Sequence, residues 1–165
     1  MKHGRLPIFV AIALCMVDPT AKAADISPVG TWRLKTFSQQ VLDTNETIRP
    51  YGDNPVDGYI QYSQSGYMVV FLSVVNPKMP APPFTDAERV EIHKGIFGAY
   101  AGRYSVEGNK VTHHIDVSWR PDWNGDNQIR YLELDGSKLT IKTAPLIASQ
   151  TGKRVVSILT FERVD

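Results

Sequence analysis

Short runs rich in Val, Ile, Thr, Tyr and Phe alternate with Gly, Asp, Asn and Pro along most of this chain. This pattern constrains the fold more than any other feature, because it is typical of β-strands joined by turns. It predicts strands at 29–38, 46–50, 57–63, 66–75, 99–106, 110–119, 127–134, 138–143 and 154–163. We therefore expect a single all-β domain of about 8–10 antiparallel strands, closed as a barrel or packed as a sandwich.

The turns at 106–111 and 134–139 share one pattern. In each, an apolar residue is followed by an acid, Gly, a polar residue, Lys and a second apolar residue. The acid–Gly pair is a strong hairpin signal. Because side chains alternate across a strand, the second hairpin divides them into two faces. The inward face carries the apolar residues and, at the same parity, two polar ones: Leu132, Leu134, Leu139, Ile141, Gln128 and Arg130.

The first hairpin divides in the same way. Burial favours an inward set of Tyr104, Val106, Val111, His113, Ile115, Val117 and Trp119. A third inward wall pairs across the turn at 64–66 and contains Ile60, Tyr62, Met68, Val70 and Leu72.

The loop at 120–126 leaves an alternative open. It contains Pro121 and Gly125, so it can hold a bulge, and turn rules do not fix the parity across it. A slip of one residue would exchange the two faces of the preceding strand. In that case His114 and Asp116 would point inward, towards Arg130.

One helix is expected near 85–98. Thr85 and Glu88 form the pattern of a capping box, and Val90, Ile96 and Phe97 follow near helical spacing. A stiff connector precedes it, with prolines at Pro77, Pro80, Pro82 and Pro83. The helix could plug one end of the barrel or act as a lid over a cavity, and the sequence favours neither.

The N-terminus has the pattern of a secretory signal peptide. Lys2 and Arg5 precede an apolar run at 6–17, which is too short to span a bilayer, and a small-x-small site ends at Ala23. We expect residues 1–23 to be cleaved and 24–165 to form the barrel domain in the periplasm or outside the cell. A retained anchor is the less favoured alternative, as is lipoprotein processing at Cys15, because Leu14 is large for that site.

Charge and cysteine content exclude several classes. Cleavage would leave 15 basic and 16 acidic residues, which is not the footprint of a nucleic-acid-binding protein. Cys15 is the only cysteine, so the domain has no disulfide framework and must depend on its apolar core.

The residues Gly30-Thr31-Trp32 resemble the Gly-x-Trp opening of lipocalins, in which the Trp closes the barrel floor and a basic residue of the last strand packs across it. Arg163 stands where that partner is expected, and a cation–π contact would stabilise the pair. The rest of the chain resembles the bacterial and fungal lipocalin-like domain family more closely. The matching stretches cover most of 29–164 and lie at 57–62, 65–68, 99–104, 113–118, 121–130 and 139–143. The resemblance implies an up-and-down, calycin-type β-barrel, and it implies little about activity.

The predicted interior is mainly apolar and carries a few polar groups, as a small-molecule pocket requires. We expect one small hydrophobic or amphipathic ligand, no cofactor and no nucleic-acid partner; the oligomeric state is open. Arg130 could neutralise a ligand head group or pair with an internal acid. Trp123 could line the cavity mouth or cover a barrel edge. The expected ligand-binding residues are Tyr104, His113, Trp119, Trp123, Gln128 and Arg130.

An enzyme is the alternative. His113 could act as a general acid or base beside Tyr104, with Arg130 stabilising a developing negative charge, as an isomerase, hydratase or cyclase would need. A binding role is favoured, because no hydrolase nucleophile motif or other catalytic set is recognisable. No metal site is expected, since His113 and His114 face opposite sides of one strand.

Overall fold

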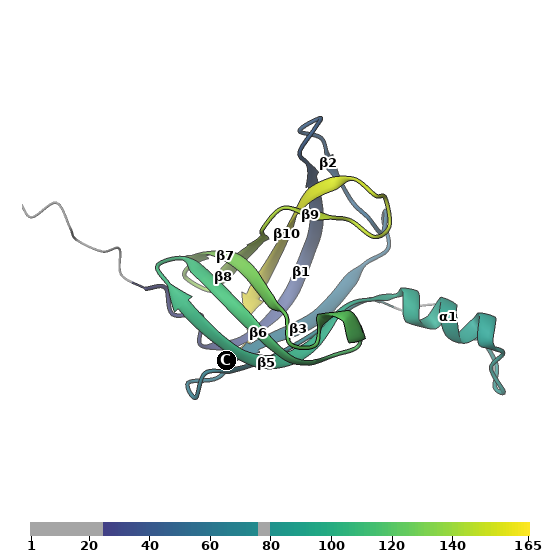
Figure 1. Cartoon of the computed structure of the whole chain (residues 1–165), viewed down its shortest axis with the longest axis horizontal. Coiled ribbons are helices and arrows are strands. Elements are labelled where there is room, and N and C mark those ends of the chain that lie inside the picture. Colours follow the sequence, from purple (N-terminus) through teal and green to yellow (C-terminus); the bar gives the residue numbers. More distant parts are fainter. Residues whose placement is uncertain (1–24, 76–79) are drawn as a thin grey trace, which may run out of the picture.

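The computed structural model describes residues 25–75 and 80–165. Its main feature is one antiparallel sheet that closes on itself into a barrel (Figure 1). The strands are β1 (Gly30–Val41), β2 (Thr47–Ile48), β3 (Val56–Tyr62), β4 (Tyr67–Val74), β5 (Ile96–Glu107), β6 (Lys110–Ser118), β7 (Asn127–Asp135), β8 (Lys138–Thr143), β9 (Leu146–Ile147) and β10 (Arg154–Arg163). The predicted all-β, up-and-down barrel is therefore confirmed.

Closure depends on pairing between the first and last long strands. Eight strands follow one another around the wall in the order β1-β3-β4-β5-β6-β7-β8-β10, and β10 then pairs with β1. The short strand β2 pairs with one end of β1, and the short strand β9 pairs with the neighbouring end of β10. The predicted strand at 46–50 is shorter than expected, and β9 is a strand that the sequence pattern did not predict.

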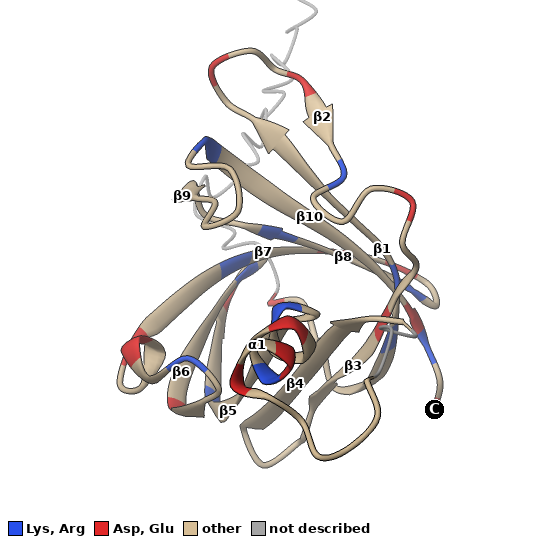
Figure 2. Ribbon diagram, turned by 90° about the vertical axis from the view of Figure 1, so that its right-hand side faces the viewer, with Lys and Arg blue, Asp and Glu red and all other residues tan. Residues whose placement is uncertain are grey.

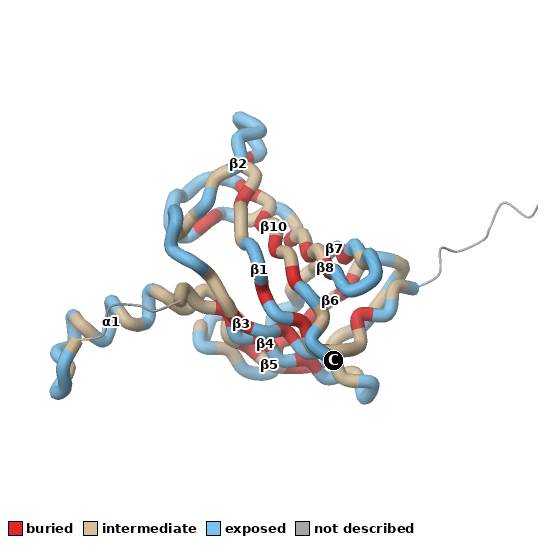
Figure 3. The backbone as a smooth tube through the Cα atoms, turned by 180° about the vertical axis from the view of Figure 1, so that it is seen from behind, coloured by how far each residue is buried: buried red, intermediate tan, exposed pale blue. Residues whose placement is uncertain are grey.

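The core lies on the inner face of the barrel wall. Both acid–Gly hairpins have the expected register, because Val106 pairs with Val111 and Leu134 with Leu139. Buried and exposed positions alternate along the strands (Figure 3). The buried set includes the predicted inward residues Ile60, Tyr62, Met68, Val70, Leu72, Val111, His113, Ile115, Leu132, Leu139 and Ile141.

A bulge in β6 overturns part of the predicted inner face. Ala101 pairs with Val117, whereas the next residue, Gly102, pairs with Ile115, so Asp116 is an extra residue. Val117, the residue just beyond the bulge, consequently lies on the outer face and is 59 % exposed instead of inward. Gly102 permits this close approach, because a Cβ there would collide with the carbonyl oxygen of His114.

The loop at 120–126 keeps the favoured parity. It contains the short 3-10 helix η1 (Pro121–Trp123). Beyond it, β7 returns so that His113 pairs with Gln128 and Val111 with Arg130. The alternative register is therefore wrong: Asp116 is exposed, and the His114 ring contacts Ser105 and Asn127 on the outer face.

The helix α1 (Asp86–Lys94) begins at the predicted capping box, in which Thr85 and Glu88 bond each other reciprocally. It ends earlier than expected, because Ile96 already belongs to β5. No residue of α1 is buried, and the helix projects away from the barrel, as Figures 1 and 3 show. In this structure it therefore neither plugs the barrel nor covers it as a lid.

Several expectations fall outside the described residues. The signal peptide at 1–23, Cys15 and Pro77 all lie there. Within the residues that are described, no helix combines the length and apolar character that a membrane crossing needs. Charged residues are scattered over the strands, the loops and α1 (Figure 2).

Trp32 and Arg163 close one end of the barrel. The Trp32 side chain is 0 % exposed, and its indole N–H donates to the Pro28 carbonyl at 2.8 Å. The guanidinium carbon of Arg163 lies 4.2 Å from the centre of the Trp32 ring, and Nη1 donates to the Val29 carbonyl at 3.1 Å. Gly30 leaves room for this arrangement, because a Cβ there would collide with Arg163. The expected contact is thus present.

We expect Arg163→Gln to lower the free energy of unfolding by about 1–2 kcal/mol, because it removes a cation–π contact from a covered ring and a hydrogen bond to a carbonyl. Urea titration followed by Trp fluorescence measures this. Arg154→Gln, an exposed change on the same strand, is the control and should stay within about 0.5 kcal/mol of the unmodified protein. Equal stability of both variants would contradict a structural role for Arg163.

Candidate functional site

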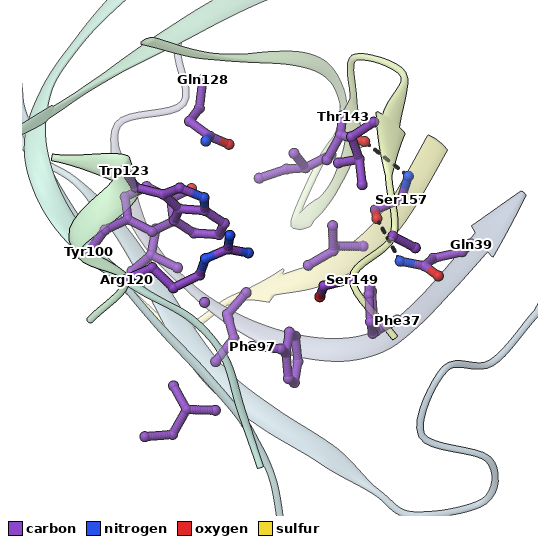
Figure 4. A pocket seen from close by; sticks show the side chains of 18 of the residues that line it. Phe37, Gln39, Phe97, Tyr100, Arg120, Trp123, Gln128, Thr143, Ser149 and Ser157 are labelled. Atoms are coloured by element: carbon purple, nitrogen blue, oxygen red, sulfur yellow. Dashed lines mark hydrogen bonds between the residues drawn. The ribbon is translucent and has the colours of Figure 1, made fainter. Parts of the chain in front are cut away.

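A cavity of about 620 Å³ occupies the barrel interior above the Trp32 floor, within the size range of small-molecule sites. Figure 4 shows its lining side chains. Most of the wall is apolar. The apolar lining includes Phe37, Ile60, Val70, Leu72, Phe97, Tyr100, Trp119, Trp123, Ile141, Leu146, Leu159 and Phe161.

A band of polar side chains crosses this apolar wall from strand to strand. Gln39 of β1 pairs with Ser157 of β10, whose backbone N–H donates to the Thr143 hydroxyl of β8 at 2.9 Å (Figure 4). Thr143 in turn pairs with Arg130 of β7. Gln128, two residues before Arg130, pairs with His113 of β6. The polar residues therefore occupy adjacent positions on neighbouring strands and form one continuous band.

Gln39 is the least satisfied member of the band. Its side chain is 4 % exposed, and its amide nitrogen donates to the Ser157 hydroxyl at a long 3.3 Å. Its amide oxygen has no hydrogen-bond partner among the described residues. A buried acceptor without a partner costs about 1–3 kcal/mol. This end of the cavity is therefore more polar than a purely structural core would be.

Arg130 places a positive charge at the cavity wall. Nη2 donates to the Gln128 amide oxygen at 2.8 Å, and Nη1 donates to the Ile129 carbonyl at 2.9 Å. Neither partner carries a charge, and no carboxylate of the described residues forms an ion pair with Arg130. Of the two roles expected for Arg130, the ion pair with an internal acid is therefore absent among the described residues.

His113 is among the residues that line the cavity, yet only 1 % of its area is exposed. Both ring nitrogens are occupied, since Nε2 lies 2.8 Å from the Tyr62 hydroxyl and Nδ1 lies 3.0 Å from the Tyr100 hydroxyl. Burial, followed by the nearby charge of Arg130, lowers the pKa of His113 well below its usual range. The ring is therefore neutral at physiological pH and has no free nitrogen for a ligand.

The aromatic residues at the mouth hold one another in place. The Trp123 ring meets Tyr100 edge-on at a centroid distance of 5.8 Å. The guanidinium carbon of Arg120 lies 4.8 Å from the centre of the Trp123 ring, and the same guanidinium donates a hydrogen bond to the Asp122 carboxylate. Trp123 thus lines the cavity, one of the two roles expected for it. Trp119 also lines the cavity and is partly exposed at the mouth.

Tyr104 is the expected site residue that the structure places elsewhere. Its hydroxyl donates to the Ser63 carbonyl at 2.8 Å, its ring packs edge-on against Tyr62, and it does not line the cavity. The anticipated group of His113, Tyr104 and Arg130 is therefore not assembled around one reacting position. Tyr104 does pair with His113 across β5 and β6, as expected, but it is the Tyr100 hydroxyl that bonds the His113 ring. Tyr100 has the same strand parity as Tyr104, so alternation marked it as inward-facing but did not show which tyrosine bonds His113.

The described residues contain no group of three or more His, Cys, Asp or Glu side chains arranged to hold a metal ion. His113 and His114 lie on opposite faces of β6, as the sequence pattern predicted.

The low pKa of His113 predicts a pH-dependent stability. The unfolded chain protonates this ring below about pH 6.5 while the folded protein does not, so stability is full above that pH and falls as the pH drops below it. Urea titrations at several pH values between 7.5 and 4.5 give the free energy of unfolding as a function of pH. His113→Gln should reduce the slope of this free energy against pH by up to about 1.4 kcal/mol per pH unit. His114→Gln, on the outer face, is the matched control. Identical slopes for the two variants would contradict a neutral buried ring.

Comparison with known proteins agrees with this architecture. The family model described as a lipocalin-like domain matches residues 29–164, which is the whole of the barrel. A search of curated proteins finds no match. The match covers well over half of the sequence, and with it this chain belongs to the lipocalin-like domain family.

Proposed function

We propose that this protein is an exported binding protein whose barrel holds one small, mostly apolar molecule with an anionic head group. The observation that carries the proposal is the charge of Arg130 at the wall of an apolar cavity without a carboxylate partner among the described residues. Arg130 is partly buried in this wall, and a bound anion would stabilise its charge.

The geometry of Arg130 fits this role. A guanidinium has five N–H donors in a planar fork. Contacts with Gln128 and Ile129 hold the side chain and leave further N–H groups for a ligand. The apolar lining supplies burial for the rest of the molecule, at roughly 25 cal/mol for each Å² removed from water. Binding strength would thus come from the walls, and head-group preference from Arg130.

Dodecanoate is a suitable first probe, and displacement of the neutral fluorophore N-phenyl-1-naphthylamine measures its affinity. We expect the unmodified protein to bind both molecules. Arg130→Gln should weaken the affinity for dodecanoate about 10- to 100-fold, because a charge-assisted contact of about 1.5–3 kcal/mol is lost. The affinity for the neutral fluorophore should not change.

Arg103→Gln is the matched control, because Arg103 lies on the outer face against the Tyr67 ring. It should bind dodecanoate as the unmodified protein does. If no lipophilic acid binds, or if Arg130→Gln binds dodecanoate with full affinity, the proposal fails.

Export is supported by the signal-like pattern at 1–23 alone. We expect the protein recovered from the periplasm or medium of a bacterial host to begin at Ala24, as intact-mass spectrometry would show. A chain that retains Met1, or one that begins at a lipidated Cys15, would contradict this part of the proposal.

A further inference from the structure

Tyr62, His113 and Tyr100 form one hydrogen-bonded row that leads from the core to the cavity. The Tyr62 hydroxyl lies 2.8 Å from Nε2 of His113, and Nδ1 lies 3.0 Å from the Tyr100 hydroxyl. Tyr62 is 1 % exposed and does not line the cavity, whereas Tyr100 does. The row therefore has a buried end and a cavity end.

The buried end determines where the protons lie. A neutral His113 has one N–H and one acceptor nitrogen. Among the described residues, the Tyr62 hydroxyl has no hydrogen-bond partner other than His113. If Nε2 carried the proton, the hydroxyl proton of Tyr62 would be buried without an acceptor, which is unfavourable. Tyr62 therefore donates to Nε2, and the N–H of the ring is on Nδ1.

This order fixes the direction of the Tyr100 hydroxyl. Because Nδ1–H donates to the Tyr100 oxygen, the hydroxyl proton of Tyr100 cannot be used in that bond. His113 is the only partner of this hydroxyl among the described residues. Its proton is consequently available on the cavity side, and Tyr100 acts there as a donor.

Arg130 lies close to the same end of the cavity. It bonds Gln128, which pairs with His113 across β6 and β7, and after burial its charge is the next cause of the lowered pKa of His113. Tyr100 and Arg130 thus offer only N–H and O–H donors. A carboxylate, which has two acceptor oxygens and no donor, is the head group that complements them best.

We propose that Tyr100 and Arg130 together bind the carboxylate of an apolar acid, and that Tyr62 and His113 are positioning residues that keep the Tyr100 hydroxyl turned towards it. This inference rests on the proposed function and names the head group and its second anchor.

The proton order can be tested without a ligand. In ¹⁵N NMR spectra of the selectively histidine-labelled protein above pH 7, we expect His113 to be protonated at Nδ1 and unprotonated at Nε2. The two nitrogen shifts should move towards each other in Tyr62→Phe, because the donor that selects this tautomer is gone. A proton on Nε2 in the unmodified protein, or an unaltered ring tautomer in Tyr62→Phe, would overturn the positioning argument.

The head-group assignment is tested by Tyr100→Phe. It should weaken dodecanoate about three- to tenfold, as expected for one lost hydrogen bond, and leave N-phenyl-1-naphthylamine binding unchanged. Tyr104→Phe is the matched control, since that hydroxyl bonds Ser63 outside the cavity lining, and it should bind dodecanoate normally.

The outcomes separate the two proposals. If Arg130→Gln weakens dodecanoate and Tyr100→Phe does not, the inference about Tyr100 is wrong and the proposed function stands. If the unmodified protein does not bind dodecanoate, both are wrong. A loss in Tyr100→Phe that extends equally to the neutral fluorophore would mean that the ring and not the hydroxyl matters, and would also overturn the inference.

Discussion

The pairing of β1 with β10 is the constraint on which the remaining structure depends. Without this seam the wall would be an open sheet with two unpaired edges, and the inner face would not be enclosed. The same seam provides both ends of the interior. Trp32 opposite Arg163 forms the floor, and Gln39 opposite Ser157 begins the polar band of the cavity. Closure and site are therefore two consequences of one strand pair.

Local turn chemistry explains why so much of the barrel could be predicted. The acid–Gly hairpins fix which residues face one another, and burial then decides which face is inside. This reasoning placed His113, Gln128 and Arg130 together on the inner wall, and the register across β6 and β7 agrees. The floor was predicted from the resemblance of Gly30-Thr31-Trp32 to the lipocalin opening, and the structure adds a physical reason, because a Cβ at Gly30 would collide with Arg163.

The features of the fold that could not be predicted from the sequence arise mainly from β-bulges. Lys35 is an extra residue in β1, so the inward parity passes from Trp32 and Leu34 to Phe37 and Gln39. A prediction from strict alternation therefore places Gln39, at the polar end of the cavity, on the wrong face of β1. The same reasoning misplaced Val117 beyond the bulge in β6. Tyr100 was missed for another reason: two tyrosines share one parity, and only tertiary contacts show that Tyr104 bonds Ser63 while Tyr100 reaches the cavity. The near-helical spacing of Ile96 and Phe97 also extended the predicted helix into residues that belong to β5.

The two ends of the described chain meet at the floor of the barrel. Asp25 accepts a hydrogen bond from the Gly108 backbone of the β5–β6 hairpin, and the Asp165 carboxylate accepts one from the Thr31 backbone beside Arg163. The lining residues at 119–123 and 146–150 belong to loops and short segments beyond the opposite strand ends. A tether, label or carrier attached at either Asp25 or Asp165 would therefore sit below the floor, and the barrel could be immobilised on a sensor surface with its opening directed at the solution.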